Sequence, residues 1–244
     1  MNGSSVRTKD RPLQVLIVCY SRYGVVQLLA ERIAEGAGRE PGVEAELLIV
    51  EDMPVTELRS DENPDDMRRR RAVLLNQLTA ADALIMGSPS YFGSMAAPLK
   101  RFFEDCTTAE GPQAQDRSRP WRHHLFRDKV GAAFAASGTP HGGNEQTLLS
   151  ILTMMMHLGM IVVTPGQRPP ILEHEAAPYG ATAISGADGR RLPSDLEQEE
   201  ARALGEQVAR VASWVRRGRQ AWEQSRAGRG PGVGRRRFSF DPSA

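Results

Sequence analysis

Residues 13–26 have the sequence LQVLIVCYSRYGVV, and this stretch decides the fold. Its first eight residues form a short, mostly apolar run, which is typical of a strand buried on both faces. From Val25 the apolar residues recur at helical spacing until Gly38 ends the pattern. A buried strand that passes through a glycine turn into an amphipathic helix is the opening unit of an α/β sheet.

The rest of the chain repeats this alternation of short apolar runs and amphipathic segments. Strands that alternate with helices predict an α/β fold, in which right-handed crossovers build an open parallel sheet with helices on both faces. Polar segments at 107–120 and 165–193 are expected to be loops. We expect further strands at 46–50, 82–87, 130–136 and 160–164, and further helices at 68–78, 95–105, 145–158 and 196–215.

Length and composition fit one globular domain with a polar segment at each end. The chain has 244 residues, of which 40% are hydrophobic and 25% charged, and its formal net charge is +1. From Arg216 onward the sequence has eight arginines and only two acidic residues, Glu223 and Asp241. The tail is therefore basic and the body mildly acidic. We expect a disordered arm at 1–12, a domain at 13–218 and a disordered Arg/Gly-rich tail at 219–244.

The terminal and apolar segments bear on location and partners. The first twelve residues are polar and lack the apolar run of a signal peptide, which predicts a cytoplasmic protein. The apolar segment 148–163 is interrupted by polar residues and is shorter than the ~20 residues of a spanning helix, so no stable membrane insertion is expected. The body has no strong positive field and the tail no aromatic platform, so no nucleic-acid partner is expected.

Three of the expected strands end in loops rich in glycine, serine, threonine and proline. These loops are residues 21–26, 88–93 and 137–143. In doubly wound sheets the ligand binds outside the carboxyl ends of the strands. The three loops therefore predict one shared crevice.

The first loop has the chemistry of a phosphate site. Ser21 supplies a hydroxyl, and Gly24 stands just before a helix N-terminus, where backbone N–H groups and the helix dipole favour an anion. The loop matches neither the Walker sequence nor the GxGxxG sequence of dinucleotide folds. For this loop taken alone, an ordinary strand–helix turn is the alternative interpretation.

The other two loops offer surfaces for a flat ring. Pro89 stiffens the second loop, and Tyr91 and Phe92 supply apolar surface of the kind that an isoalloxazine ring packs against. The glycines of the third loop let the backbone approach a ligand closely. The alternatives are that Phe92 is a core residue and that the third loop is a flexible surface turn; we interpret His141 as solvated.

Other kinds of active site find no support in the sequence. His123 and His124 are adjacent and cannot share a helical face, and neither a CxxC nor an HxxxH pair is present, so no metal site is expected. A Ser–His–Asp hydrolase would need a GxSxG elbow, which is absent. We assign no catalytic side chain, because the chain fits a protein whose cofactor supplies the chemistry.

Together the loops resemble those of the WrbA family, whose members are flavodoxin-like, FMN-dependent NAD(P)H:quinone oxidoreductases. The similarity covers about residues 13–215, through SRYGVV at 21–26, GSPSYFG at 87–93 and ASGTPHGGNEQT at 136–147. Its most specific part is PYGATAISGADGRRLPS at 178–194, which plain flavodoxins lack. The resemblance implies a flavodoxin-like, doubly wound, five-stranded parallel sheet with strand order 2-1-3-4-5, and a homo-oligomer, either a dimer or the family's tetramer.

The resemblance also implies roles for individual residues. Tyr23 is expected to contact the nicotinamide nucleotide, and Trp121 to lie near the flavin and the quinone, although Trp121 as a surface-loop anchor is the alternative. Leu158 takes the place of a family histidine that directly precedes the glycine matching Gly159. The residues expected at FMN, besides Leu158, are Ser21, Arg22, Tyr23, Gly24, Val25 and Val26 at the phosphate, and Ser88, Pro89, Ser90, Phe92, Gly93, Ser137, Gly138, Thr139 and Gly142 at the ring.

The implied activity is the transfer of two electrons from NADH or NADPH to a quinone. In the family this is a ping-pong reaction, with hydride transfer through flavin N5 and hydroquinone as product, so the chain is expected to be a dehydrogenase. A flavodoxin-type electron carrier without catalytic activity, or a diverged flavin-binding protein, is the alternative; such carriers are usually small and strongly acidic. Leu158 and the Pro140-His141 pair in a longer third loop depart from the family and bear more on quinone turnover than on FMN binding.

Overall fold

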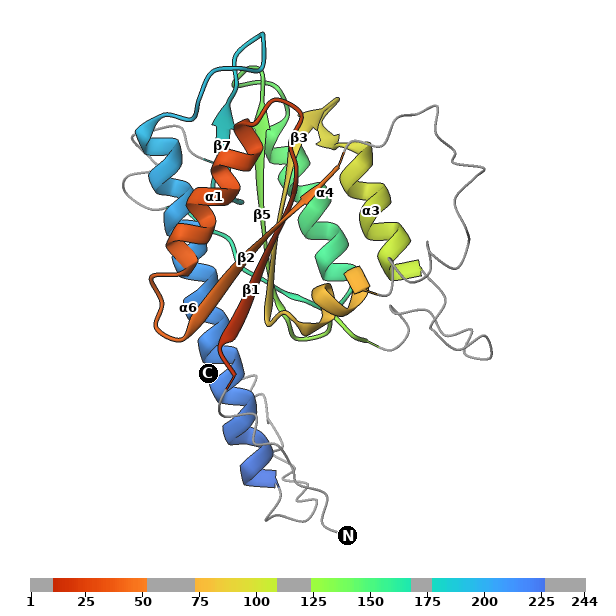
Figure 1. The fold of residues 1–244 in the computed structure, drawn as a ribbon, viewed down its shortest axis with the longest axis vertical. Helices are drawn as coiled ribbons and strands as arrows, with labels where there is room; N and C mark the ends of the chain where they lie inside the picture. Colours follow the sequence, from red (N-terminus) through yellow and green to blue (C-terminus); the bar gives the residue numbers. More distant parts are fainter. Residues whose placement is uncertain (1–10, 52–72, 109–123, 168–176, 227–244) are drawn as a thin grey trace, which may run out of the picture.

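The computed structural model describes residues 11–51, 73–108, 124–167 and 177–226. Helices cover both faces of a central sheet, with α1 and α6 on one side and α3 and α4 on the other (Figure 1). Residues 73–80 are also helical. The elements are β1 (Leu13–Tyr20), α1 (Val25–Ala37), β2 (Val43–Val50), β3 (Ala83–Tyr91), β4 (Ser94–Met95), α3 (Ala97–Thr108), β5 (Val130–Ser137), α4 (Asn144–His157), β6 (Ile161–Val162), β7 (Ala181–Ile184) and α6 (Asp195–Arg226).

The strand order of the sheet is β2-β1-β3-β5-β6, and each of these neighbours pairs in parallel. Numbered by the five strands expected from the sequence, this is the order 2-1-3-4-5, so the flavodoxin-like prediction is confirmed. The short strand β4 adds an antiparallel pair at the end of β3. In the part of the chain that the structure describes, β2 pairs with β1 alone and forms one edge of the sheet.

The other edge differs from the prediction, because two short strands share it. β6 pairs with the start of β5, and β7 pairs with its end, from Phe134 to Ser137. The expected loop at 165–193 therefore contains a strand. The four residues of β7 are too few to show a strand pattern in the sequence, and their pairing with β5 joins residues 47 positions apart in the chain.

Two apolar layers form the core, one on each face of the sheet. Along β1, Val15, Ile17 and Cys19 face α1 and α6, whereas Leu16 and Val18 face the helices on the other side. Side chains of successive strand residues point to opposite faces, so a strand covered on both sides is apolar throughout. This is the physical reason for the unbroken apolar run that opens the domain.

Helices α1 and α6 cross unusually closely, and glycine makes this approach possible. A Cβ atom on Gly205 of α6 would lie 2.0 Å from the carbonyl oxygen of Ile33, and one on Gly36 of α1 would lie 1.9 Å from that of Arg202. Both helices begin at the end of the sheet where β1 and β5 terminate (Figure 1). The crossing therefore fixes their N-termini relative to each other.

Helix α6 is longer than the sequence predicts. It continues for eleven residues beyond Val215, and Figure 1 shows this part projecting past the body of the domain. Within the described ranges, no helix has the length and apolar character needed to cross a membrane. The expected arm at 1–10, the start of the 68–78 helix, most of the 107–120 loop, residues 168–176 and the tail from 227 lie outside the described residues.

Candidate functional site

A crevice of about 200 Å³ opens at the carboxyl ends of β1, β3 and β5. All three loops singled out in the sequence contribute to it, through Ser21–Val26, Pro89–Tyr91 and Ala136–Gly138. A fourth loop, from Ser185 to Gly189 after β7, completes the wall. This is the position at which doubly wound sheets bind ligands.

The first wall is a turn that leads into α1. Gly24 has a φ of +91°, and no side chain caps the helix from this position. The Gln27 N–H donates to Ser21 Oγ at 3.2 Å and the Leu28 N–H to the Gly24 carbonyl at 2.9 Å. The N–H groups at the start of a helix have no partner within the helix, and the first turn of α1 carries no acidic side chain. The turn can therefore bind an anionic group.

The second and third walls are joined by hydroxyl groups. Ser90 Oγ donates to the Gly142 carbonyl at 2.7 Å, and Thr147 Oγ1 donates to Ser90 Oγ at 2.8 Å. Ser137 Oγ donates to the Thr139 carbonyl, also at 2.7 Å. These bonds fix the end of β3 to the loop after β5 and to α4.

The fourth wall was not assigned to the site from the sequence. Its Ser185 N–H donates to the Ser137 carbonyl at 2.7 Å, which attaches it to the end of β5. Glu197 in the first turn of α6 accepts the Ile184 N–H at 2.8 Å and the Ser194 N–H at 2.6 Å. The signal that identifies such a wall is Gly186-Ala187-Asp188-Gly189, a turn sequence directly after a strand.

Tyr23 connects the first wall to the fourth. Its ring lies against Gly189, where an added Cβ atom would come within 2.7 Å of the ring. The Arg22 guanidinium carbon is 5.9 Å from the centroid of the same ring. Tyr23 keeps 58% of its surface exposed. The tyrosine therefore stands at the mouth of the crevice, accessible to a second molecule.

The structure brings nine of the predicted residues onto the crevice wall: Ser21, Arg22, Tyr23, Val25, Val26, Pro89, Ser90, Ser137 and Gly138. Gly24 shapes the first wall without lining it. Ser88 does not line the crevice, because it is fully buried and its hydroxyl is already engaged. Ser88 Oγ donates to the Pro89 carbonyl at 2.8 Å and accepts the Ala96 N–H at 2.7 Å, so it supports the loop from behind.

The remaining predicted residues lie away from the wall. Thr139 and Gly142 form a turn, with the Gly142 N–H bonded to the Thr139 carbonyl at 2.9 Å. Phe92 is fully exposed at a φ of +54°, so it is not a core residue, and neither it nor Gly93 lines the crevice. Leu158 follows the last residue of α4, about 20 Å along the helix from the crevice end. Trp121 lies outside the described residues.

Neither a reactive thiol nor a metal-binding cluster is found close to the crevice in the described residues. Cys19 lies near the end of β1, and burial, helped by Glu31, raises the pKa of its thiol to about 12. The thiol is therefore protonated at neutral pH and is not a nucleophile. The described residues contain no group of three or more His, Cys, Asp or Glu side chains that would hold a metal ion.

Comparisons with known proteins agree with this geometry. The family model for NADPH-dependent FMN reductase matches residues 14–169. The chain is 35% identical to an NAD(P)H dehydrogenase (quinone) from Gluconacetobacter diazotrophicus, over 82% of this chain and 97% of that protein. A protein of the same name from Syntrophobacter fumaroxidans is also 35% identical, with the same coverage of both chains.

Solved structures support the fold. A WrbA-like flavodoxin from Agrobacterium tumefaciens superposes with a TM-score of 0.55 at 24% identity, over 83% of this chain and 98% of that chain. An archaeal flavodoxin gives a TM-score of 0.51 at 19% identity, over 82% and 99%. With a matching family model over most of the domain, and relatives aligned over nearly their whole length, the chain belongs to the NADPH-dependent FMN reductase family.

Proposed function

We propose that this protein is an FMN-dependent oxidoreductase that transfers two electrons from NADH or NADPH to a quinone. The observation that carries the proposal is the crevice itself, where an uncapped helix N-terminus and three further loops meet at the carboxyl ends of the strands. Relatives over four fifths of the chain are named NAD(P)H dehydrogenase (quinone), which supports the choice of electron donor and acceptor.

The residues present suit FMN. The turn at Ser21–Val26 offers backbone N–H groups and no carboxylate, which fits a phosphate monoester. Pro89, Tyr91 and Gly138 offer flat surface and backbone for the ring, and the 185–189 loop closes the side near Tyr23. Bound FMN supplies the redox chemistry, because its ring accepts a hydride and gives up two electrons.

The size of the crevice supports successive use by two substrates. Its volume of about 200 Å³ is below the ~300 Å³ that is typical of pockets that enclose their ligand. FMN bound there would therefore keep one side exposed to solvent. Tyr23 stands at this open side with much of its ring exposed. We infer that NAD(P)H and then the quinone stack there in turn, as a ping-pong reaction requires.

Two anaerobic measurements on the flavin-loaded protein test this function. NADH or NADPH is expected to bleach the flavin absorbance, and benzoquinone is expected to restore it with formation of hydroquinone. Protein mixed with riboflavin, which lacks the phosphate, serves as the control and is expected to retain far less flavin after desalting. Flavin binding without bleaching would instead support the rival function, a carrier or a diverged flavin-binding protein.

We also propose that the protein acts in the cytoplasm as a homo-oligomer, a dimer or a tetramer. The family resemblance supports this proposal. Light scattering of the FMN-loaded full chain would measure the assembly directly. A mass of 26.8 kDa for the particle in solution would contradict it.

A further inference from the structure

A second cavity lies at the opposite end of the sheet from the flavin crevice. Its volume is about 520 Å³, within the range of sites that bind small molecules. It is open to solvent on one side and is lined by Arg11–Leu13 at the start of β1, by the Pro41–Gly42 turn before β2, and by one face of α6. The proposed electron transfer makes no use of this cavity.

The α6 wall of this cavity is a polar stripe. Ser213, Arg216, Arg217 and Gln220 are spaced i, i+3, i+4 and i+7, which places them on one side of a helix. Helix faces that pack against a protein body are normally apolar. In α6 the residues packed in the core end with Val208, Ala209 and Ala212, and the polar stripe follows them along the helix.

Several of these polar groups have no partner within the described residues. Ser213 is only 6% exposed, yet its hydroxyl makes no hydrogen bond there. Arg217 and Gln220 likewise make no side-chain hydrogen bond or ion pair in the part of the chain that the structure describes. Among the described residues, the buried side-chain atoms without a partner are Arg32 Nε and Asn144 Oδ1. The Ser213 hydroxyl is therefore accessible from the cavity and can donate to a molecule bound there.

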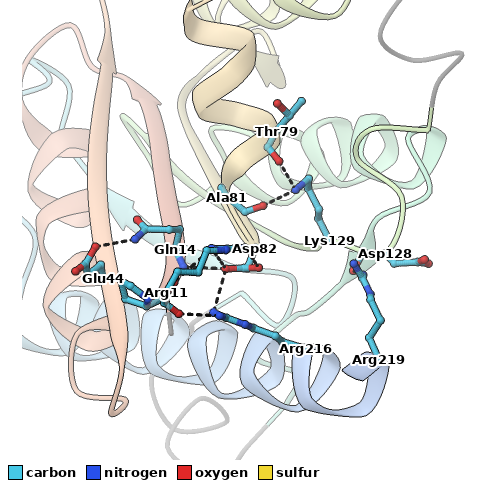
Figure 2. Close-up of polar contacts among 11 residues, drawn as sticks. Arg11, Gln14, Glu44, Thr79, Ala81, Asp82, Asp128, Lys129, Arg216 and Arg219 are labelled. Carbon is cyan, nitrogen blue, oxygen red and sulfur yellow. Dashed lines mark hydrogen bonds and ion pairs between the residues drawn. The ribbon is translucent and has the colours of Figure 1, made fainter. Parts of the chain in front are cut away.

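Asp82 fixes the two other guanidinium groups of the cavity (Figure 2). Arg11 donates two hydrogen bonds to its carboxylate, from Nη2 at 2.8 Å and from Nη1 at 2.9 Å. Arg216 Nη1 lies 3.7 Å from the same carboxylate. Arg216 Nη2 also donates to the Arg11 carbonyl at 2.7 Å. Groups held in place before a ligand arrives lose less conformational entropy when they bind it.

The charge of this end of the molecule is positive. Among the described residues, three guanidinium groups line the cavity, whereas its wall has a single carboxylate, that of Glu44, and Asp82 lies behind it. Glu44 is partly occupied by Gln14, whose Nε2 donates to it at 2.7 Å. Lys129 and Arg219 lie close by, donating to backbone carbonyls of Ala81 and Asp128 (Figure 2). The cavity therefore favours an anion.

We propose that this cavity binds a phosphorylated small molecule. Arg217 and the fixed pair of Arg11 and Arg216 contact the phosphate oxygens, because a planar guanidinium matches phosphate in a bidentate manner. Ser213 and Gln220 supply further donors. Pro12, Leu13 and Pro41 cover the non-phosphate part of the ligand.

Calorimetric titration of the FMN-saturated full chain with inorganic pyrophosphate tests the proposal. Saturation with FMN occupies the phosphate-binding turn of the crevice, so the titration reports on the second cavity. We expect binding that Arg217→Ala weakens at least tenfold and Ser213→Ala weakens less. The matched control is Arg210→Ala, because Arg210 lies on the same helix outside the cavity and pairs with Glu206 at 3.4 Å. This control is expected to bind as the wild type does.

Three outcomes would overturn the proposal. The first is no binding at millimolar pyrophosphate. The second is an equal loss of affinity in Arg217→Ala and Arg210→Ala. The third is binding that the FMN-free chain shows and the FMN-saturated chain does not. Adenosine monophosphate and a ten-residue oligothymidylate form two further arms. Tighter binding of the oligonucleotide, with a loss on Arg226→Ala as large as on Arg217→Ala, would assign the basic helix to a nucleic-acid surface instead.

Discussion

Gly24 gives the turn proposed to bind phosphate its shape, because its φ of +91° is costly for any residue with a side chain. We expect Gly24→Ala to shift the start of α1 and to raise the dissociation constant for FMN about tenfold, which corresponds to ~1.4 kcal/mol. Quenching of flavin fluorescence measures this constant. Gly42→Ala is the matched control, with a φ of +76° and open space around the added methyl group. An equal effect of both substitutions on FMN would contradict the role of the turn.

Cys19 makes stability fall at high pH. Its folded pKa of about 12 exceeds the value of 9.0 for a free thiol, so above pH 9 the unfolded chain loses a proton that the folded chain retains. The free energy of unfolding therefore falls as the pH rises from 9 towards 12, by up to ~1.36 kcal/mol per pH unit. Urea unfolding at pH 8 and pH 10 checks this. Cys19→Ala should lose about 1 kcal/mol less between these pH values, and an equal loss would contradict the assignment.

Residue chemistry could be predicted from the sequence where the backbone supplies it, and less well where side chains compete for partners. The turn at 21–26 lies on the crevice wall, and Gly24 before an amphipathic helix indicated an anion site there on local grounds; anion binding by this turn stays a prediction. Ser88 looked equally suitable. Its hydroxyl instead accepts the Ala96 N–H, a contact made by the way that the chain turns back after β3.

Among the elements, the close crossing of α1 and α6 carries the sharpest prediction. Gly205→Ala places a methyl group 2.0 Å from the Ile33 carbonyl oxygen, so the helices must separate, and we expect a loss of ~1–3 kcal/mol in the free energy of unfolding. Gly218→Ala lies on the same helix with nothing near the added atom, and should gain up to ~1 kcal/mol from helix propensity. Urea unfolding compares the two. A stable Gly205→Ala variant would show that the crossing is less tight.

Elements with a strong apolar pattern were predicted from the sequence within a few residues, as β1, α1 and α4 show. Two others were missed in part. β7 has four residues and gains its stability from pairing with β5, a contact distant in the sequence. The end of α6 has no buried face, so no apolar periodicity marks it; alanine, glutamine, arginine and glutamate extend the helix by propensity.

At the scale of the whole molecule, FMN should stabilise the fold by mass action, because it binds only the folded chain. At a free concentration one hundred times its dissociation constant, FMN adds ~2.7 kcal/mol, or about 5–10 °C in melting temperature for a domain of this size. Thermal unfolding with and without FMN measures the shift. Riboflavin cannot use the turn at Ser21–Val26 and should produce a smaller one; an equal shift would contradict phosphate recognition.

The outer edge of β2 also affects how the protein behaves in concentrated solution. An open strand edge is a template on which a second copy can add its own strand, and such growth leads to aggregates. Glu44 and Glu46 alternate along β2 with exposed side chains. Two such edges brought together would set carboxylates near carboxylates, which opposes pairing at neutral pH. Salt would screen this repulsion, so storage at high ionic strength carries the greater risk of precipitation.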